Sequence, residues 1–173
     1  MLYRSNHHRY NVVCDRVGHV HIFDRETIQD IPSDVAEALL TFKNTVCANK
    51  WLVPIRTRHG DLEVTDDLTL FVARSARGRV LGTIAFNEIG SDGRLEIEYV
   101  CSDAGCGYGR ELMNRFSDWL HGRISSLPRP PEWSSITLTS VSEAVGFYLK
   151  IGFVYHDDNR ELSLVMHRKD AVP

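Results

Sequence analysis

A glycine-rich segment contains the residues whose types and spacing most clearly predict chemistry. It reads Tyr99-Val100-Cys101-Ser102-Asp103-Ala104-Gly105-Cys106-Gly107-Tyr108-Gly109-Arg110 and joins a predicted strand to a predicted helix. Glycine lets a backbone approach a ligand closely, and successive N–H groups at the start of a helix attract anions. The segment therefore predicts a site for a diphosphate. A connection that binds no ligand is the alternative.

Two better-known phosphate loops are excluded by the spacing of these glycines. A dinucleotide-binding fingerprint that began at Gly105 would need glycine at position 110, where Arg110 stands. One that began at Gly107 would need a small residue at position 112, where Leu112 stands. A P-loop would need Gly-Lys followed by serine or threonine, and the chain contains no such sequence.

A second motif occupies residues 140–153, where Ser140 and Glu143 have the spacing of a helix capping box and Gly152 is placed to end the helix. Its other characteristic residues are Ala144, Phe147, Tyr148 and Phe153. Together, the two segments resemble the GNAT acetyltransferase superfamily. The first is similar to its cofactor-binding motif, and the second to its Ala-x-x-Phe-Tyr-x-x-x-Gly-Phe motif. The resemblance extends over about residues 68–166.

This resemblance implies a single α/β (α+β) domain with a mixed, mostly antiparallel central sheet and helices on both faces. The sheet would splay between the strands ending at Cys101 and Thr139, and acetyl-coenzyme A would lie there as a cosubstrate, without a metal. The residues then expected to bind it are Tyr99, Val100, Cys101, Gly105, Cys106, Gly107, Tyr108, Gly109, Arg110 and Tyr148. Ala104 departs from the family, which usually has arginine or glutamine there, so phosphate contacts would depend on backbone amides and Arg110.

Tyr148 matches the family tyrosine that donates a proton or a hydrogen bond to the departing coenzyme A thiolate. A phenol with a pKa of about 10 is protonated at neutral pH and can do so. The alternative is an aromatic core residue, because Ala144, Tyr148 and Ile151 share one helical stripe. The implied reaction is direct transfer, in which a neutral amine attacks the thioester and no acyl-enzyme forms.

The base that deprotonates the amine is expected on the strand at residues 94–101. Glu96 and Glu98 alternate with Leu95, Ile97 and Tyr99, which are predicted to share one face, so both glutamates would point to the opposite face. We place Glu98 first because it lies nearer the splay, and Glu96 second. Glu88, near the end of the preceding strand, is a third candidate. The alternative is that these carboxylates are solvated or paired at the surface.

The four cysteines, Cys14, Cys47, Cys101 and Cys106, lack the close paired spacing of a zinc site. A chain of this length does not need a disulfide framework, so free thiols are predicted. A helix N-terminus lowers a thiol pKa, which makes Cys106 a candidate nucleophile. The sequence offers no base to pair with it, so the favoured interpretation is that Cys106 is only a small residue of the glycine loop.

Two histidines, His19 and His21, would point to the same face of a predicted strand, and this raises the alternative of a metal site. No cysteine or carboxylate cluster nearby completes a set of ligands, so surface histidines are favoured. The acids Asp61, Glu63, Asp66 and Asp67 could attract a cationic amine, although a solvated loop is the favoured reading.

The remaining elements alternate around these motifs. Strands are expected at residues 19–23, 68–72, 80–86, 94–101, 135–139, 153–156 and 162–167. Helices are expected after Ser33, Arg110 and Ser140, and the last two should end near Gly122 and Gly152. Residues 50–67 fit either a short helix or a long loop. Residues 1–67 are predicted to form the substrate side and residues 68–167 the cofactor-binding core of one domain spanning 1–173.

The composition sets outer limits on function. The chain has 173 residues, of which 43% are apolar, and a net charge of −3. These values fit one domain with a real core, and they exclude a wholly disordered chain and a nucleic-acid binder of the usual basic kind. No apolar run approaches the ~18 residues that span a membrane, and the start is too polar for a signal peptide, so a cytoplasmic location is expected.

The leading hypothesis is an acetyl-coenzyme A-dependent N-acetyltransferase that acts on a primary amine of a small molecule, a polyamine or a protein. The alternative is a non-catalytic module of the same fold that binds an acyl-coenzyme A or a protein partner. No nucleic-acid or membrane partner is expected. The oligomeric state stays open, with a homodimer common in the family.

Overall fold

The computed structural model describes residues 14–24, 27, 31–45, 68–87, 94–103, 106–127, 133–155 and 161–167. These residues form seven strands and three helices. In chain order they are β1 (Val17–Phe23), α1 (Ser33–Thr45), β2 (Leu68–Ser75), β3 (Val80–Asn87), β4 (Arg94–Ser102), α2 (Tyr108–Ser125), β5 (Trp133–Thr139), α3 (Ser142–Lys150), β6 (Val154–Tyr155) and β7 (Glu161–His167).

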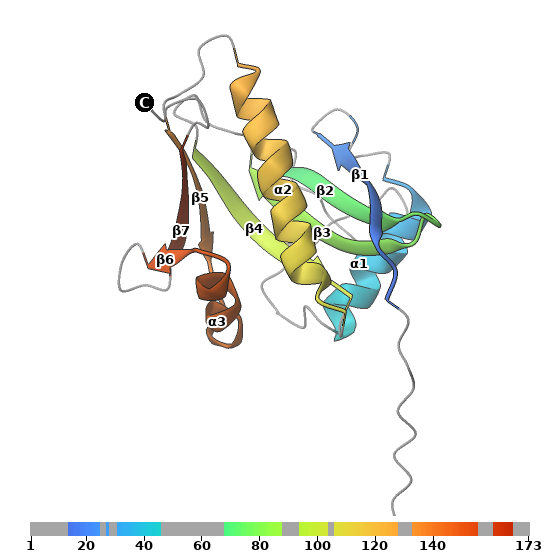
Figure 1. Ribbon diagram of the computed structural model, residues 1–173. Coiled ribbons are helices and arrows are strands. Elements are labelled where there is room, and N and C mark those ends of the chain that lie inside the picture. The colour runs from blue at the N-terminus through green and yellow to red at the C-terminus, as the bar shows by residue number, and fades with distance from the viewer. Residues whose placement is uncertain are drawn as a thin grey trace, which may run out of the picture.

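The strands form one sheet in the order β1-β2-β3-β4-β5-β7-β6. Neighbours are antiparallel except β4 and β5, which run parallel. Figure 1 shows α2 and α3 on one side of this sheet and α1 on the other. The expected mixed, mostly antiparallel sheet with helices on both faces is therefore confirmed.

Each face of the sheet has its own apolar core. The core on the α2 face is centred on aromatic rings, with Phe71 and Phe86 packed edge-on against Phe116 at centroid distances of 5.3 and 5.0 Å. The core on the α1 face contains Val35 and Leu39 of α1 and extends over the sheet. A strand between two helical layers must be apolar on both faces, and β2 and β3 are buried along most of their length for this reason.

A β-bulge at Glu98 makes β4 change faces. Across the β3–β4 ladder Phe86 lies opposite Ile97 and Ala85 lies opposite Tyr99, so Glu98 has no opposing residue. Ile97 accordingly belongs to the core on the α2 face, whereas Tyr99 belongs to the core on the α1 face. The prediction that Leu95, Ile97 and Tyr99 share one face is wrong for Tyr99, because one extra residue inverts the alternation of side chains.

The helix ends differ in part from the predicted ones. Helix α2 continues past Gly122 to Ser125. Helix α3 begins after Val141 without a side-chain cap, and the Ser140 hydroxyl donates to the Val141 carbonyl instead, so the predicted capping box is wrong. Gly152 does end the helix, with φ +103° and the two backbone bonds of a Schellman motif, Gly152 N to Leu149 O at 3.3 Å and Phe153 N to Tyr148 O at 3.1 Å.

The prediction of free thiols is wrong for every described cysteine. Cys14 and Cys106 form a disulfide, with their Cα atoms 5.6 Å apart, and Cys101 is also disulfide-bonded. Spacing along the chain could not reveal the first bond, because 92 residues separate its ends and only the fold brings them together. Cys106 in this state is not a nucleophile.

Some predictions fall on residues outside the described part. These are Glu88, Ala104, Gly105, the acids of residues 61–67 and the choice between helix and loop at residues 50–67. Within the described residues, no helix combines the length and apolar character needed to cross a membrane.

Candidate functional site

The sheet opens between β4 and β5. The two strands pair in parallel from Arg94 opposite Ser135 to Ile97 opposite Leu138, and this pairing ends there. β4 continues to Ser102, whereas β5 ends at Thr139. The last paired residue directly precedes the bulge at Glu98, which bends β4 and increases its twist. Figure 1 shows the two strands diverging toward the end of the sheet that lies near the start of α2 and α3.

The N-terminus of α2 lies next to this opening and has the geometry of an anion site. Gly107 is the N-cap, with φ +71°, and the helix has no side-chain cap. The first bond of the turn, from Arg110 N to Gly107 O, is 3.2 Å long. None of the described residues lies within 4 Å of a β-carbon placed at Gly107, so none of them fills the space beside the N-cap. An 18-residue helix places a partial positive charge at this end.

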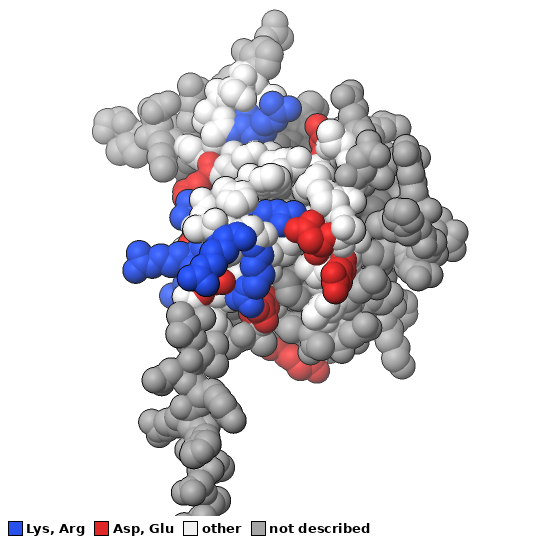
Figure 2. All heavy atoms as spheres, turned by 90° about the vertical axis from the view of Figure 1, so that its right-hand side faces the viewer, with Lys and Arg blue, Asp and Glu red and all other residues white. Residues whose placement is uncertain are grey.

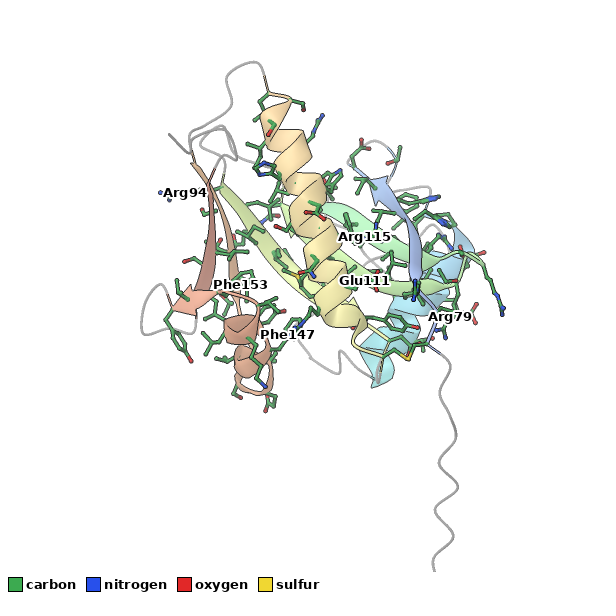
Figure 3. All side chains as sticks on the ribbon, in the orientation of Figure 1. Arg79, Arg94, Glu111, Arg115, Phe147 and Phe153 are labelled. Atoms are coloured by element: carbon green, nitrogen blue, oxygen red, sulfur yellow. A yellow bond between two sulfur atoms is a disulfide. The ribbon has the colours of Figure 1, made fainter. Side chains whose placement is uncertain are left out.

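Arg79, from the turn between β2 and β3, supports this loop. Its guanidinium pairs with Asp103 at 3.2 Å and with Asp15 at 3.4 Å, and it donates to the Tyr108 hydroxyl at 3.5 Å. Tyr108 is almost fully buried beneath the loop. Figure 3 shows Arg79 beside the foot of α2, and Figure 2 shows positive and negative side chains grouped on this face. No sequence pattern pointed to Arg79, which lies far from the glycine segment along the chain.

Tyr148 of α3 packs in an aromatic group on the α2 face of the sheet. Its ring contacts Phe147 at a centroid distance of 5.1 Å and Phe153 at 5.5 Å. Burial raises the pKa of Tyr148 to about 12. The Schellman turn produces the contact with Phe153, because residues before and after such a turn commonly pack together. Tyr148 is thus a buried core residue of α3 on the α2 face of the sheet.

Phe147 brings the two sequence motifs together. A β-carbon at Gly109, in the first turn of α2, would lie 3.4 Å from Phe147 Cζ and 3.5 Å from Ser102 Oγ. The start of α2, the end of β4 and helix α3 therefore meet at one place, as Figure 3 shows for the side of α3 that carries Phe147.

The two glutamates lie on the α1 face of the sheet. The Asn87 side-chain amide donates to Glu98 Oε1 at 2.9 Å. Phe86 faces α2, so the next residue, Asn87, points toward the α1 face, and Glu98 lies with it. Glu96 lies between Leu95 and Ile97, which face α2, so its side chain points to the α1 face as well. Both carboxylates are exposed. Tyr148 belongs to the α2 face, so the opening in the sheet lies between it and the glutamates.

Tyr99 occupies a different place from the one predicted. Its side chain is enclosed in the core on the α1 face, away from Tyr148, and burial raises its pKa. Tyr99 can therefore contribute to the opening only through its backbone N–H and C=O groups.

His19 and His21 are exposed on β1, with ring centroids 5.1 Å apart. Among the described residues, no group of three or more histidine, cysteine, aspartate or glutamate side chains could hold a metal ion.

Comparison with known proteins gives a fold assignment. No protein-family model and no curated protein matches the sequence. Many solved structures do match. Tetrahymena Gcn5 is 17% identical with a TM-score of 0.60, and the match covers 87% of this chain and 97% of that one. Spermidine N-acetyltransferase SpeG from Vibrio cholerae is 13% identical with a TM-score of 0.52, over 88% and 94%. An acyl-CoA N-acyltransferase from Pseudomonas aeruginosa is 18% identical with a TM-score of 0.51, over 85% and 97%. This chain has the fold of the GNAT acetyltransferases.

Proposed function

We propose that this protein is an N-acetyltransferase that moves an acetyl group from acetyl-coenzyme A directly to a primary amine. One observation carries the proposal: the parallel pairing of β4 and β5 stops at Ile97 and Leu138, and beyond it β4 leads into the uncapped N-terminus of α2 while β5 leads into α3, which carries Tyr148. The fold supports the proposal. The similar structures are Gcn5, a spermidine N-acetyltransferase and an acyl-CoA N-acyltransferase.

The start of α2 fits the diphosphate of coenzyme A. The left-handed backbone at Gly107 and the open space beside it let the helix N–H groups approach an anion without a side chain in the way. Tyr108 and Gly109 belong to the same first turn, and the Arg110 side chain is exposed next to it. Cys106 contributes its backbone, because its side chain is in the disulfide.

Tyr148 acts as a hydrogen-bond donor to the departing thiolate. Its pKa of about 12 lies well above the value of about 8.5 that is ordinary for a thiol. Complete proton transfer from this phenol to a thiolate is therefore unfavourable, whereas a hydrogen bond to the developing negative charge is favourable. The phenol stays protonated over the whole neutral range.

Glu98 is the proposed acceptor of the amine proton, with Glu96 as second choice. The Asn87 amide holds one oxygen of Glu98 and leaves the other available. Since the glutamates and Tyr148 lie on opposite faces, the amine would enter from the α1 face and meet the thioester in the opening. The acceptor class is a primary amine of a small molecule, a polyamine or a protein; among the similar structures, SpeG is named for spermidine.

The proposal is tested by coenzyme A release over a panel of amines and peptides. Tyr148→Phe should lower kcat about 100-fold or more while the Kd for acetyl-coenzyme A stays within twofold. Tyr155→Phe is the matched control, because it removes a hydroxyl from a tyrosine that is 56% exposed on β6. Tight binding of acetyl-coenzyme A with no turnover on any acceptor would instead favour a non-catalytic binding module.

A further inference from the structure

The Cys14–Cys106 disulfide joins the segment before β1 to the candidate phosphate-binding loop, by which we mean Cys106, Gly107 and the first turn of α2. Cys106 directly precedes Gly107, the N-cap of α2, and Cys14 lies three residues before β1. In Figure 3 the sulfur atoms lie at the foot of α2, near Arg79. The bond thus anchors the backbone at Cys106, immediately before the N-cap of α2.

Ion pairs also link the two segments that contain Cys14 and Cys106. Arg79 pairs with Asp15, the neighbour of Cys14, and with Asp103, three residues before Cys106. The Arg79 side chain is 52% exposed, and partly exposed pairs of this kind contribute little by themselves. The covalent bond is therefore the main constraint that joins Cys14 to Cys106, and the ion pairs add little to it.

We infer that the Cys14–Cys106 disulfide is a redox-sensitive latch on the phosphate-binding loop, so that the oxidised protein binds acetyl-coenzyme A more tightly than the reduced protein. This inference rests on the proposed function. The closed bond holds the loop in its binding geometry before the ligand arrives, which reduces the entropy cost of binding. The open bond leaves a Cys106 thiol at a helix N-terminus, where the thiolate form is favoured. Its negative charge would repel a diphosphate.

The redox step needs only a dithiol reductant. The Cys14 side chain is exposed, so a thiolate of the dithiol can attack Cys14 Sγ, form a mixed disulfide and release Cys106 as a thiolate. The second thiol of the reductant then displaces Cys14 and closes its own disulfide. Two electrons pass from the dithiol to the protein, which gains two thiols.

Two variants isolate this bond from the disulfide of Cys101. Cys14→Ser opens the latch and keeps the Cys106 thiol, whereas Cys14→Ser/Cys106→Ser opens it without leaving a thiol. Calorimetry should show that Cys14→Ser raises the Kd for coenzyme A about fivefold or more, and the double variant by less. Dithiol treatment of wild type should also raise the Kd, and reoxidation should restore it. The same treatment of Cys14→Ser measures how much of that rise comes from the disulfide of Cys101.

Amide hydrogen exchange on the folded proteins provides the structural readout. Opening the bond should speed exchange at residues 107–111, in the first turn of α2, and leave residues 119–125 at its other end unchanged. Equal Kd values for the wild type and both variants, or exchange that rises evenly along α2, would overturn the latch alone. If the oxidised wild type binds no coenzyme A, the proposed function fails and the latch fails with it.

Discussion

The ring of Phe147 in α3 packs against Gly109 in the first turn of α2. A β-carbon at Gly109 would lie 3.4 Å from Phe147 Cζ and 3.6 Å from Phe147 Cε2, at the short end of ordinary van der Waals contact. The contact crosses the opening between β4 and β5 and links the two sequence motifs. Phe147 also touches Tyr148, so the position of the proposed hydrogen-bond donor depends on the absence of a side chain at Gly109.

Gly109→Ala should therefore disturb the site more than the fold. Alanine favours a helix by about 1 kcal/mol over glycine, which offsets the cost of moving the Phe147 ring by a few tenths of an ångström. We expect little change in the free energy of unfolding and a severalfold rise in KM for acetyl-coenzyme A. Urea unfolding and steady-state kinetics measure the two effects.

Gly122→Ala is the matched control for that variant. Gly122 lies in the same helix, and a β-carbon there would meet nothing within 4 Å. The substitution should stabilise the protein by about 0.5–1 kcal/mol and leave KM unchanged. Equal KM values for Gly109→Ala and wild type would show that Phe147 has no influence on the cofactor site.

Gly107→Ala tests the phosphate-binding role through the backbone alone. Gly107 has φ +71° and open space around it, so alanine meets no clash and introduces only left-handed strain of about 1–2 kcal/mol. Gly78, in the turn between β2 and β3, has φ +87° and equally open space, and Gly78→Ala carries the same strain. Both variants should lose similar stability, and only Gly107→Ala should weaken coenzyme A binding in calorimetry. Equal affinities in the two variants would refute the anion site at Gly107.

Local patterns predicted most of the fold, and they failed in two ways: at a strand whose register a neighbouring strand decides, and at a helix start where a side chain has a competing local partner. The alternation of residues 94–101 predicts the strand, yet the bulge at Glu98 moves Tyr99 to the other face, and only the ladder with β3 reveals it. The end of α3 could be predicted, because the glycine at 152 acts within one turn. The start of α3 could not, since Ser140 bonds to its neighbour's carbonyl instead of capping the helix.

The candidate site was predictable in its residue types but not in its arrangement. The glycine segment joins β4 to α2, and Tyr148 lies in α3, which follows β5, so the two motifs come after the two strands that part at the opening. The supports of that site come from distant parts of the chain: Arg79 from a turn, Asn87 from a neighbouring strand and Cys14 from the N-terminal segment. Spacing along the sequence contains no information on such contacts, because the fold alone creates them.

The raised pKa of Tyr148 makes a specific prediction for the pH dependence of the rate. A phenol with a pKa of about 12 stays protonated through pH 10, so kcat should not fall between pH 8 and pH 10 through loss of this proton. The measurement is a pH profile of kcat for wild type and for Tyr148→Phe. A fall centred in that interval, present in wild type and absent from the variant, would mean that the tyrosine ionises with an ordinary pKa.

The ion pair between Asp34 and Arg74 should make the attachment of α1 sensitive to acid. Arg74 is buried on β2, and its guanidinium donates to both oxygens of Asp34, at the start of α1, and to Gly78 O. The hydrogen bond from Arg74 holds the pKa of Asp34 below its ordinary value of 3.8. A carboxyl group with a lowered pKa stabilises the folded state above its unfolded pKa, and this contribution is lost as the pH falls through the folded pKa.

Asp34→Asn should therefore cost about 1 kcal/mol of unfolding free energy at pH 7, a modest value because the Asp34 side chain is 55% exposed. The difference between variant and wild type should shrink as the pH drops below 3.8 and disappear once Asp34 is protonated in the folded protein. Asp118→Asn, which removes an exposed carboxylate from α2, should leave stability nearly unchanged at both ends of this range. Urea unfolding of the three proteins at pH 7 and pH 3 measures these differences. A cost for Asp34→Asn that is the same at both pH values would show that the ionised carboxylate does not hold α1 to the sheet.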